Sequence, residues 1–236
     1  MGRISELAKD IGLAFKLCRH TKSFKADFIF YAISGLIYLI GLTSDALSRG
    51  DGNMLFLALS FGMVAPIGAT ATYHSVLYSD FCSTCPISRK LQIGVPHLLS
   101  SVGVFLAFSL AVLIEGLFGK GERGDVVAFL ALSMGTYMFF AVSARKNYWV
   151  MVVLFILFVM PIISGGVSYI SGGRLYYVLS QLVREYLKYF KDKQREAVLI
   201  GYGILLLFSI LSWCALKRLW KFEGSKFYQS MREKVI

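Results

Sequence analysis

Two cysteines, Cys82 and Cys85, have the C-x-x-C spacing that serves redox exchange or metal binding in other proteins. A zinc site needs four ligands, and no second pair follows at the spacing of a zinc finger. The other side chains that could contribute are scattered: Cys18, His20, His74 and His97. Redox exchange would need a thioredoxin-like context, which the surrounding sequence lacks. We therefore expect two small residues on a loop, and no metal site in this chain.

Motifs for catalysis are not found either. The sequence has no H-E-x-x-H, no G-x-S-x-G and no Walker-type glycine loop. Charged side chains inside apolar stretches, which often mark function in a membrane, are few. Asp45 and Asp125 stand at the boundaries of such stretches, and Glu115 stands near the end of another, where we expect it to reach water. We therefore expect no enzyme activity, catalytic residue or cofactor in this chain.

The composition of the chain predicts a membrane protein. Of 236 residues, 56% are hydrophobic and only 17% are charged, and the mean hydropathy is +0.64. Soluble domains carry more charge and less apolar mass. The net charge of +11 would indicate nucleic acid for a soluble protein. For a membrane protein it favours lipid headgroups and an acidic groove on a cytoplasmic partner.

The apolar runs predict an all-α integral membrane protein with six transmembrane helices, forming a single transmembrane domain over residues 1–236. A bilayer core needs about 20 apolar residues in a helix. The first run is the shortest, so we expect it to draw on flanking residues. No signal-peptide cleavage site follows it, so we expect it to remain as a span. The predicted spans are 28–43, 54–77, 96–118, 126–144, 148–170 and 197–216.

The distribution of Lys and Arg orients these spans in the plasma membrane. With the N-terminus inside, most basic residues lie inside, and both termini are cytoplasmic. The two short outer loops hold only Arg49, Lys120 and Arg123. The basic segment 172–196 falls outside, against this trend. An alternative treats the fifth run as a re-entrant loop broken at Pro161, which would bring that segment inside.

Two segments have the periodicity of amphipathic helices. Residues 1–26 predict an interfacial helix on the inner leaflet, which either only anchors the chain or also touches a cytoplasmic partner. Its apolar positions are Ile4, Leu7, Ala8, Ile11, Phe15 and Cys18. Residues 172–196 predict a helix on the outer headgroups, with a solvated hairpin as the alternative. Its apolar positions are Leu175, Val178, Leu179, Leu182, Val183, Tyr186 and Phe190.

The loop between the second and third runs, residues 78–94, is the most informative segment. Pro86 suits the first turn of a short helix, where its missing N–H is not needed. Arg89 and Lys90 would face the cytosol from that turn, while Ile87 and Leu91 return the chain to the membrane. We expect a short helix against the bilayer that exposes a basic tip.

This loop resembles that of ABC-2 type permeases, the membrane subunits of one class of ATP-binding-cassette transporters. There it often reads Leu-Pro-(Val/Ile)-Ser-Arg-(Lys/Arg) after an acidic lead-in. Here it reads Cys-Pro-Ile-Ser-Arg-Lys from Cys85 to Lys90, with Asp80 as the acid. The chain length, the position after the second of six spans, the N-terminal interfacial helix and the helical outer segment are also similar.

The resemblance implies the membrane half of an exporter. Such permeases form a homodimer, or a heterodimer with a related permease, and bind ABC ATPase subunits that hold ATP and Mg. The loop would act as the coupling helix, with the partner-binding residues Asp80, Phe81, Pro86, Ile87, Ser88, Arg89, Lys90 and Leu91. The cargo would be hydrophobic or amphipathic: a peptide, lipid or drug. The alternative function is a non-ABC secondary transporter or channel, for which only the broken fifth run offers a site.

Overall fold

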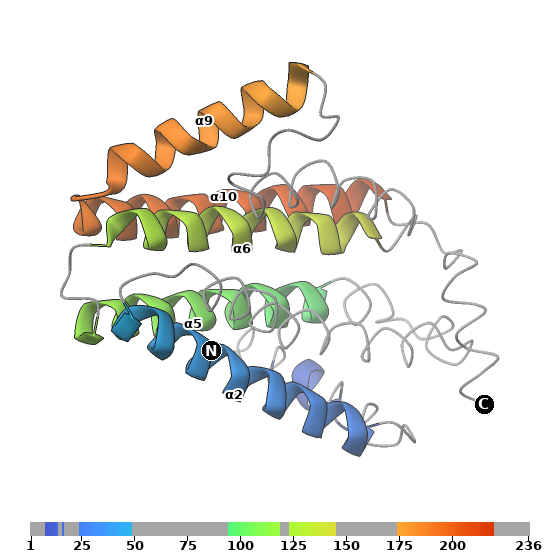
Figure 1. Cartoon of the computed structure of the whole chain (residues 1–236). Helices are drawn as coiled ribbons and strands as arrows, with labels where there is room; N and C mark the ends of the chain where they lie inside the picture. The colour runs from blue at the N-terminus through green and yellow to red at the C-terminus, as the bar shows by residue number, and fades with distance from the viewer. Residues whose placement is uncertain are drawn as a thin grey trace.

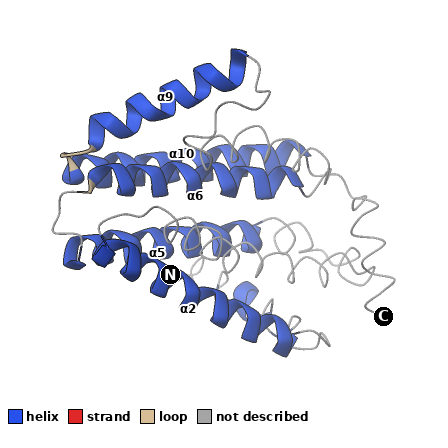
Figure 2. Cartoon of the chain, in the orientation of Figure 1, coloured by secondary structure: helices blue, strands red, loops and turns tan. Residues whose placement is uncertain are grey.

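The described part of the protein is a bundle of helices (Figures 1 and 2). The computed structural model describes residues 8–13, 16, 24–48, 94–118, 123–144 and 174–219. Within these ranges its helices are α2 (Phe24–Ser48), α5 (Val95–Phe118), α6 (Gly124–Ala144), α9 (Arg174–Phe190) and α10 (Gln194–Leu219). Residues 8–13 are also helical. The predicted all-α class is confirmed for these ranges.

Helices coincide with the first, third, fourth and sixth predicted spans. The first extends well beyond 28–43, because α2 has 25 residues. Among the described residues, two segments are long and apolar enough to cross a membrane, namely His97–Phe118 in α5 and Gln194–Lys217 in α10. The predicted spans 54–77 and 148–170 lie outside the described residues.

Helix α6 is the centre of the described bundle. Side chains 123–139 are all buried or half-buried, and α10 and α5 pack against α6, while α2 packs on α5 (Figure 1). Small residues allow close approach, as is common between helices in membranes. A Cβ on Gly201 of α10 would lie 2.6 Å from Cζ of Phe108, and one on Gly135 of α6 would lie 2.5 Å from Cδ2 of Phe208.

The outer faces of α2, α5 and α10 are apolar. Leu199 and Leu117, for example, are 74% and 69% exposed. Other exposed side chains on these helices are Ile33, Leu36, Ile40, Val102, Leu106, Leu110, Leu113, Leu206, Leu207 and Ile210. Soluble proteins rarely expose apolar patches of this extent. Acyl chains of a bilayer would cover this surface without loss of hydrophobic stabilisation, so it favours a membrane location.

Helix α9 confirms the helix predicted within 172–196, although its place on the outer headgroups stays a prediction. It lies at an angle beside α6 (Figure 1). Its last residue, Phe190, is buried, and Tyr186 packs on Phe190 with ring centroids 5.0 Å apart. A Cβ on Gly124 would overlap the carbonyl oxygen of Phe190 and lie 2.9 Å from N of Gln194. The start of α6 therefore touches the turn between α9 and α10.

Candidate functional site

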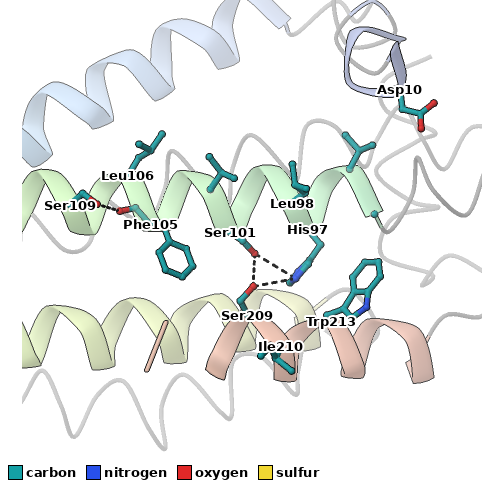
Figure 3. Close-up of a pocket in the computed structure, with 13 residues that line it drawn as sticks. Asp10, His97, Leu98, Ser101, Phe105, Leu106, Ser109, Ser209, Ile210 and Trp213 are labelled. Atoms are coloured by element: carbon teal, nitrogen blue, oxygen red, sulfur yellow. Dashed lines mark hydrogen bonds between the residues drawn. The ribbon is translucent and has the colours of Figure 1, made fainter. Parts of the chain in front are cut away.

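A cavity lies between α5 and α10 and is the candidate functional site (Figure 3). Its volume is about 890 Å³, which falls within the range of small-molecule sites. The described lining residues are Asp10, Gly94, Val95, His97, Leu98, Ser101, Val102, Phe105, Leu106, Ser109, Ser209, Ile210 and Trp213. Three elements contribute: the N-terminal helical segment, the first two thirds of α5, and the second half of α10.

A cluster of hydroxyl and imidazole groups joins the two helices across the cavity. Oγ of Ser101 and Oγ of Ser209 are 2.9 Å apart, and Nε2 of His97 lies 3.5 Å from each (Figure 3). Ser101 also lies 3.8 Å from Sδ of Met138 on α6. His97 and Ser101 are four residues apart, so they share one face of α5. The serine–histidine separation exceeds the about 2.6–3.2 Å of a nucleophile and its base, which favours binding over nucleophilic catalysis.

A second polar pair lies further along the same helices. Oγ of Ser109 donates a hydrogen bond of 2.8 Å to the carbonyl oxygen of Phe105 and lies 2.8 Å from the Tyr202 hydroxyl. Since the single Ser109 proton goes to the carbonyl, Tyr202 donates to Ser109. The Tyr202 ring also stacks on Phe105 at 6.2 Å and meets Phe108 edge-on at 5.1 Å. Polar contacts between α5 and α10 thus extend from His97 to Ser109.

The remaining described walls are apolar apart from one carboxylate. Val102, Leu106 and Ile210 line the cavity and are 49%, 61% and 52% exposed. Beyond the start of α5 lies Asp10 (Figure 3), the one lining residue with a formal charge among those described. Trp213 lies with its ring centroid 5.4 Å from that of His97. The cavity is therefore amphipathic. It has a polar seam, formed by His97, Ser101, Ser109 and Ser209, and a broad hydrophobic wall.

The opposite end of the bundle holds a buried ion cluster. Arg123, just before α6, places Nη2 2.6 Å from Oδ2 of Asp45 on α2 and Nη1 3.5 Å from Oε1 of Glu115 on α5. Nη1 also donates to the Asp45 carbonyl oxygen at 3.0 Å. Both carboxylate side chains are fully buried, and the arginine side chain is 17% exposed. One guanidinium thus ties three helices together, a geometry for which the planar fork of arginine is suited.

The expectation that Glu115 reaches water is therefore wrong. Glu115 lies near the end of α5, as predicted, but it is fully buried and pairs with Arg123. The sequence contained a signal for the cavity that was also missed. Serines 101 and 109 stand eight residues apart on a mostly apolar helix, and Tyr202 and Ser209 stand seven apart on another, spacings that place each pair toward one helix face.

The predicted coupling-helix residues lie outside the described residues, as do Cys18, His20, His74, Cys82 and Cys85. Of the potential metal ligands, the structure describes His97, whose neighbours are two hydroxyls and an indole. In the described part of the chain no three His, Cys, Asp or Glu side chains are grouped to hold a metal ion. The helix predicted over 1–26 is described at 8–13 and 16, where the chain is helical, and at 24–26, which belong to α2.

No protein family, curated protein or solved structure was matched by the chain. The function therefore has to be argued from the residues and the geometry above. What this arrangement can do is hold an amphipathic small molecule between two apolar helices.

Proposed function

We propose that this chain is the transmembrane permease subunit of an ATP-driven ABC-2 type exporter, and that the cavity between α5 and α10 belongs to its substrate path. The observation that carries the proposal is the cavity itself. It has a volume of about 890 Å³ and lies between two helices that are long and apolar enough to cross a membrane. A polar seam inside an otherwise lipid-like bundle is expected for a route that amphipathic molecules take across a bilayer.

The direction of the helices supports the six-span topology of the proposal. In Figure 1, α2 and α5 end at the same side of the bundle at which α6 and α10 begin. The predicted spans 54–77 and 148–170 would complete this alternation. By the Lys and Arg distribution, this shared end faces outward and both termini are cytoplasmic. The α9–α10 turn touches the start of α6, which supports an outer location for the end of segment 172–196.

The energy source in the proposal is a separate ABC ATPase. The chain has no nucleotide-binding loop of its own, so ATP and Mg would be held by the partner. The segment Cys85–Lys90 resembles the coupling helix of ABC-2 permeases, and Ile87, Arg89 and Lys90 would dock in a groove of the ATPase. A second permease, either another copy or a related chain, would complete the transporter.

Charge reversal in the coupling segment tests this proposal. The ATPase to use is a Walker-motif protein encoded beside this chain, co-expressed and recovered by pull-down at two salt concentrations. Partly exposed ion pairs contribute little singly, about 0–1 kcal/mol. Arg89→Glu with Lys90→Glu adds repulsion, so it should lose the ATPase, whereas the double alanine variant should lose less. The matched control is Arg145→Glu with Lys146→Glu, a basic pair in another predicted inner loop, which should retain it.

Two outcomes would contradict the proposal. One is equal ATPase recovery by all variants at both salt concentrations. The other is ATP hydrolysis by the isolated, verified pure chain. The pull-down can be interpreted only if every variant inserts normally into the membrane. Normal insertion is expected, because Asp and Glu contribute little to the orientation of membrane spans.

A secondary transporter or channel is the second candidate, and one observation favours it. Asp45 and Glu115 are buried carboxylates within the helical bundle, and buried acids in membranes often belong to ion pathways. Their shared partner Arg123 favours a structural role instead. Transport by inside-out vesicles separates the two: ATP without an ion gradient should drive the exporter, and an ion gradient without ATP should drive the alternative.

A further inference from the structure

We propose that the cavity between α5 and α10 selects a hydrophobic cation, meaning an amine or onium group on a large apolar body. The identification of this ligand as exported cargo rests on the proposed function, but its binding does not. The inference is carried by three features of the cavity: the charge on its wall, the direction of its hydrogen bonds, and its exposed apolar side.

The charge of the cavity wall is opposite to that of the chain. The sequence has 25 Lys and Arg against 14 Asp and Glu. Among the described lining residues, however, Asp10 is the one acid, and none is Lys or Arg. Charges interact more strongly near low-dielectric walls than in bulk water. Among the described lining residues the one formal charge is thus negative, which favours a cation over an anion.

The hydrogen bonds of the polar seam leave acceptors facing the ligand. Ser101 can donate to Met138 Sδ, one hydroxyl proton lies between Ser101 and Ser209, and His97 Nε2 is 3.5 Å from both serine oxygens. The Ser109 proton goes to a backbone carbonyl. Hydroxyl oxygens keep free lone pairs after donating their protons. These oxygens can solvate a positive charge.

The apolar side of the cavity gives the ligand its second property. Val102, Leu106 and Ile210 line the cavity and are also about half exposed on the outside of the bundle. In a bilayer this side would face acyl chains, so a ligand with an apolar body could enter from the lipid. The Trp213 ring adds an aromatic face, on which cations bind well. Lys217 Nζ lies 5.3 Å from the centroid of that ring but does not line the cavity.

Equilibrium binding tests charge selection directly. The purified full chain in nanodiscs is titrated with radiolabelled tetraphenylphosphonium and, separately, with tetraphenylborate, which has nearly the same shape and the opposite charge. Uptake by empty nanodiscs is subtracted for each probe. We expect saturable binding of the cation and at least tenfold weaker binding of the anion. Equal binding of the two probes, or no saturable binding of the cation, would overturn the proposal.

Four variants locate the binding to this cavity. Asp10→Asn, which removes the charge at constant size, should weaken cation binding about tenfold. Trp213→Leu should do the same through loss of the aromatic face. Lys217→Met should strengthen it about twofold, because the exposed ammonium repels the ligand through screened solvent. The control is Glu185→Gln, an exposed acid on α9 away from the cavity, which should leave binding unchanged.

The binding measurements test the ligand assignment separately from the exporter assignment. Binding is measured without ATP or ATPase, so a chain that binds the cation but recovers no ATPase would contradict only the exporter assignment. A chain that recovers the ATPase but shows no charge selection would contradict only the ligand assignment. Unchanged affinity in both Asp10→Asn and Trp213→Leu, or weaker cation binding by Lys217→Met, would also overturn the ligand assignment.

Discussion

Replacing Arg123 with glutamine should destabilise the bundle by about 3–5 kcal/mol, the usual cost of breaking a buried ion pair by removing one partner. Arg123 makes contacts of 2.6, 3.0 and 3.5 Å to Asp45 and Glu115, and both carboxylate side chains are fully buried. Without the guanidinium, two buried carboxylates lose their cation. Because the arginine side chain is 17% exposed, water can reach the site in part, so we expect the lower end of this range.

Equilibrium unfolding in mixed micelles, with increasing SDS and helicity as the signal, measures this cost. The key comparison is the triple variant Arg123→Gln, Asp45→Asn and Glu115→Gln. It should recover most of the stability lost by Arg123→Gln alone, because the buried carboxylate charges are removed together with the guanidinium. The control is Lys193→Gln, which removes an exposed ion pair to Glu196 of 3.8 Å and should leave the unfolding midpoint unchanged.

Two results would refute the reasoning. If Arg123→Gln unfolds at the same SDS fraction as the parent chain, the two carboxylates are solvated in the assembled protein rather than buried. If the triple variant is no more stable than Arg123→Gln, the loss comes from helix packing near the loop and not from unpaired charge.

Three further predictions concern the packing and orientation of the helices. Gly124→Ala should lower the unfolding free energy by about 1–3 kcal/mol, since its Cβ would overlap the carbonyl at the end of α9. The control Gly203→Ala, where a Cβ meets nothing within 4 Å, should be neutral or slightly stabilising. Equal losses of unfolding free energy in the two variants would contradict the contact at Gly124. Tyr202→Phe should cost about 1 kcal/mol in the same assay through loss of the hydroxyl that binds Ser109, and no measurable change would mean that the pair is solvated. A cysteine at Lys191, in a chain whose native cysteines are replaced, should react with an impermeant maleimide on intact cells; reaction only after permeabilisation would place segment 172–196 inside.

The helices were predictable because each depends on a local pattern. The long apolar runs of α5, α6 and α10 exceed what a strand would need, and their ends in the structure lie within a few residues of the predicted ones. Helix α9 was predicted from positions such as Val183, Tyr186 and Phe190, which recur at helical spacing. These patterns need no knowledge of what lies across from them.

The sites were less predictable because they depend on residues far apart in the sequence. Asp45 and Arg123 are separated by 78 positions, and Ser101 and Ser209 by 108. A single serine in an apolar helix often bonds to its own backbone, as Ser109 also does. Which serines meet a partner depends on the rotation of α5 against α10, which the two patterns taken separately do not determine.

The two ends of the bundle are held together by different kinds of contact. At one end, Arg123 joins α2, α5 and α6, and Gly124 contacts the α9–α10 turn; the cavity lies toward the other end. Glu115 and His97 are 18 residues apart on α5, which is a distance of about 27 Å along the helix axis at the usual helical rise. A rotation of about 10° about the fixed end would therefore move the His97 turn by about 5 Å, within the range of hinged motions in proteins. A small tilt of α5 about the ion cluster would therefore change the width of the cavity by several times more than it moves the cluster itself.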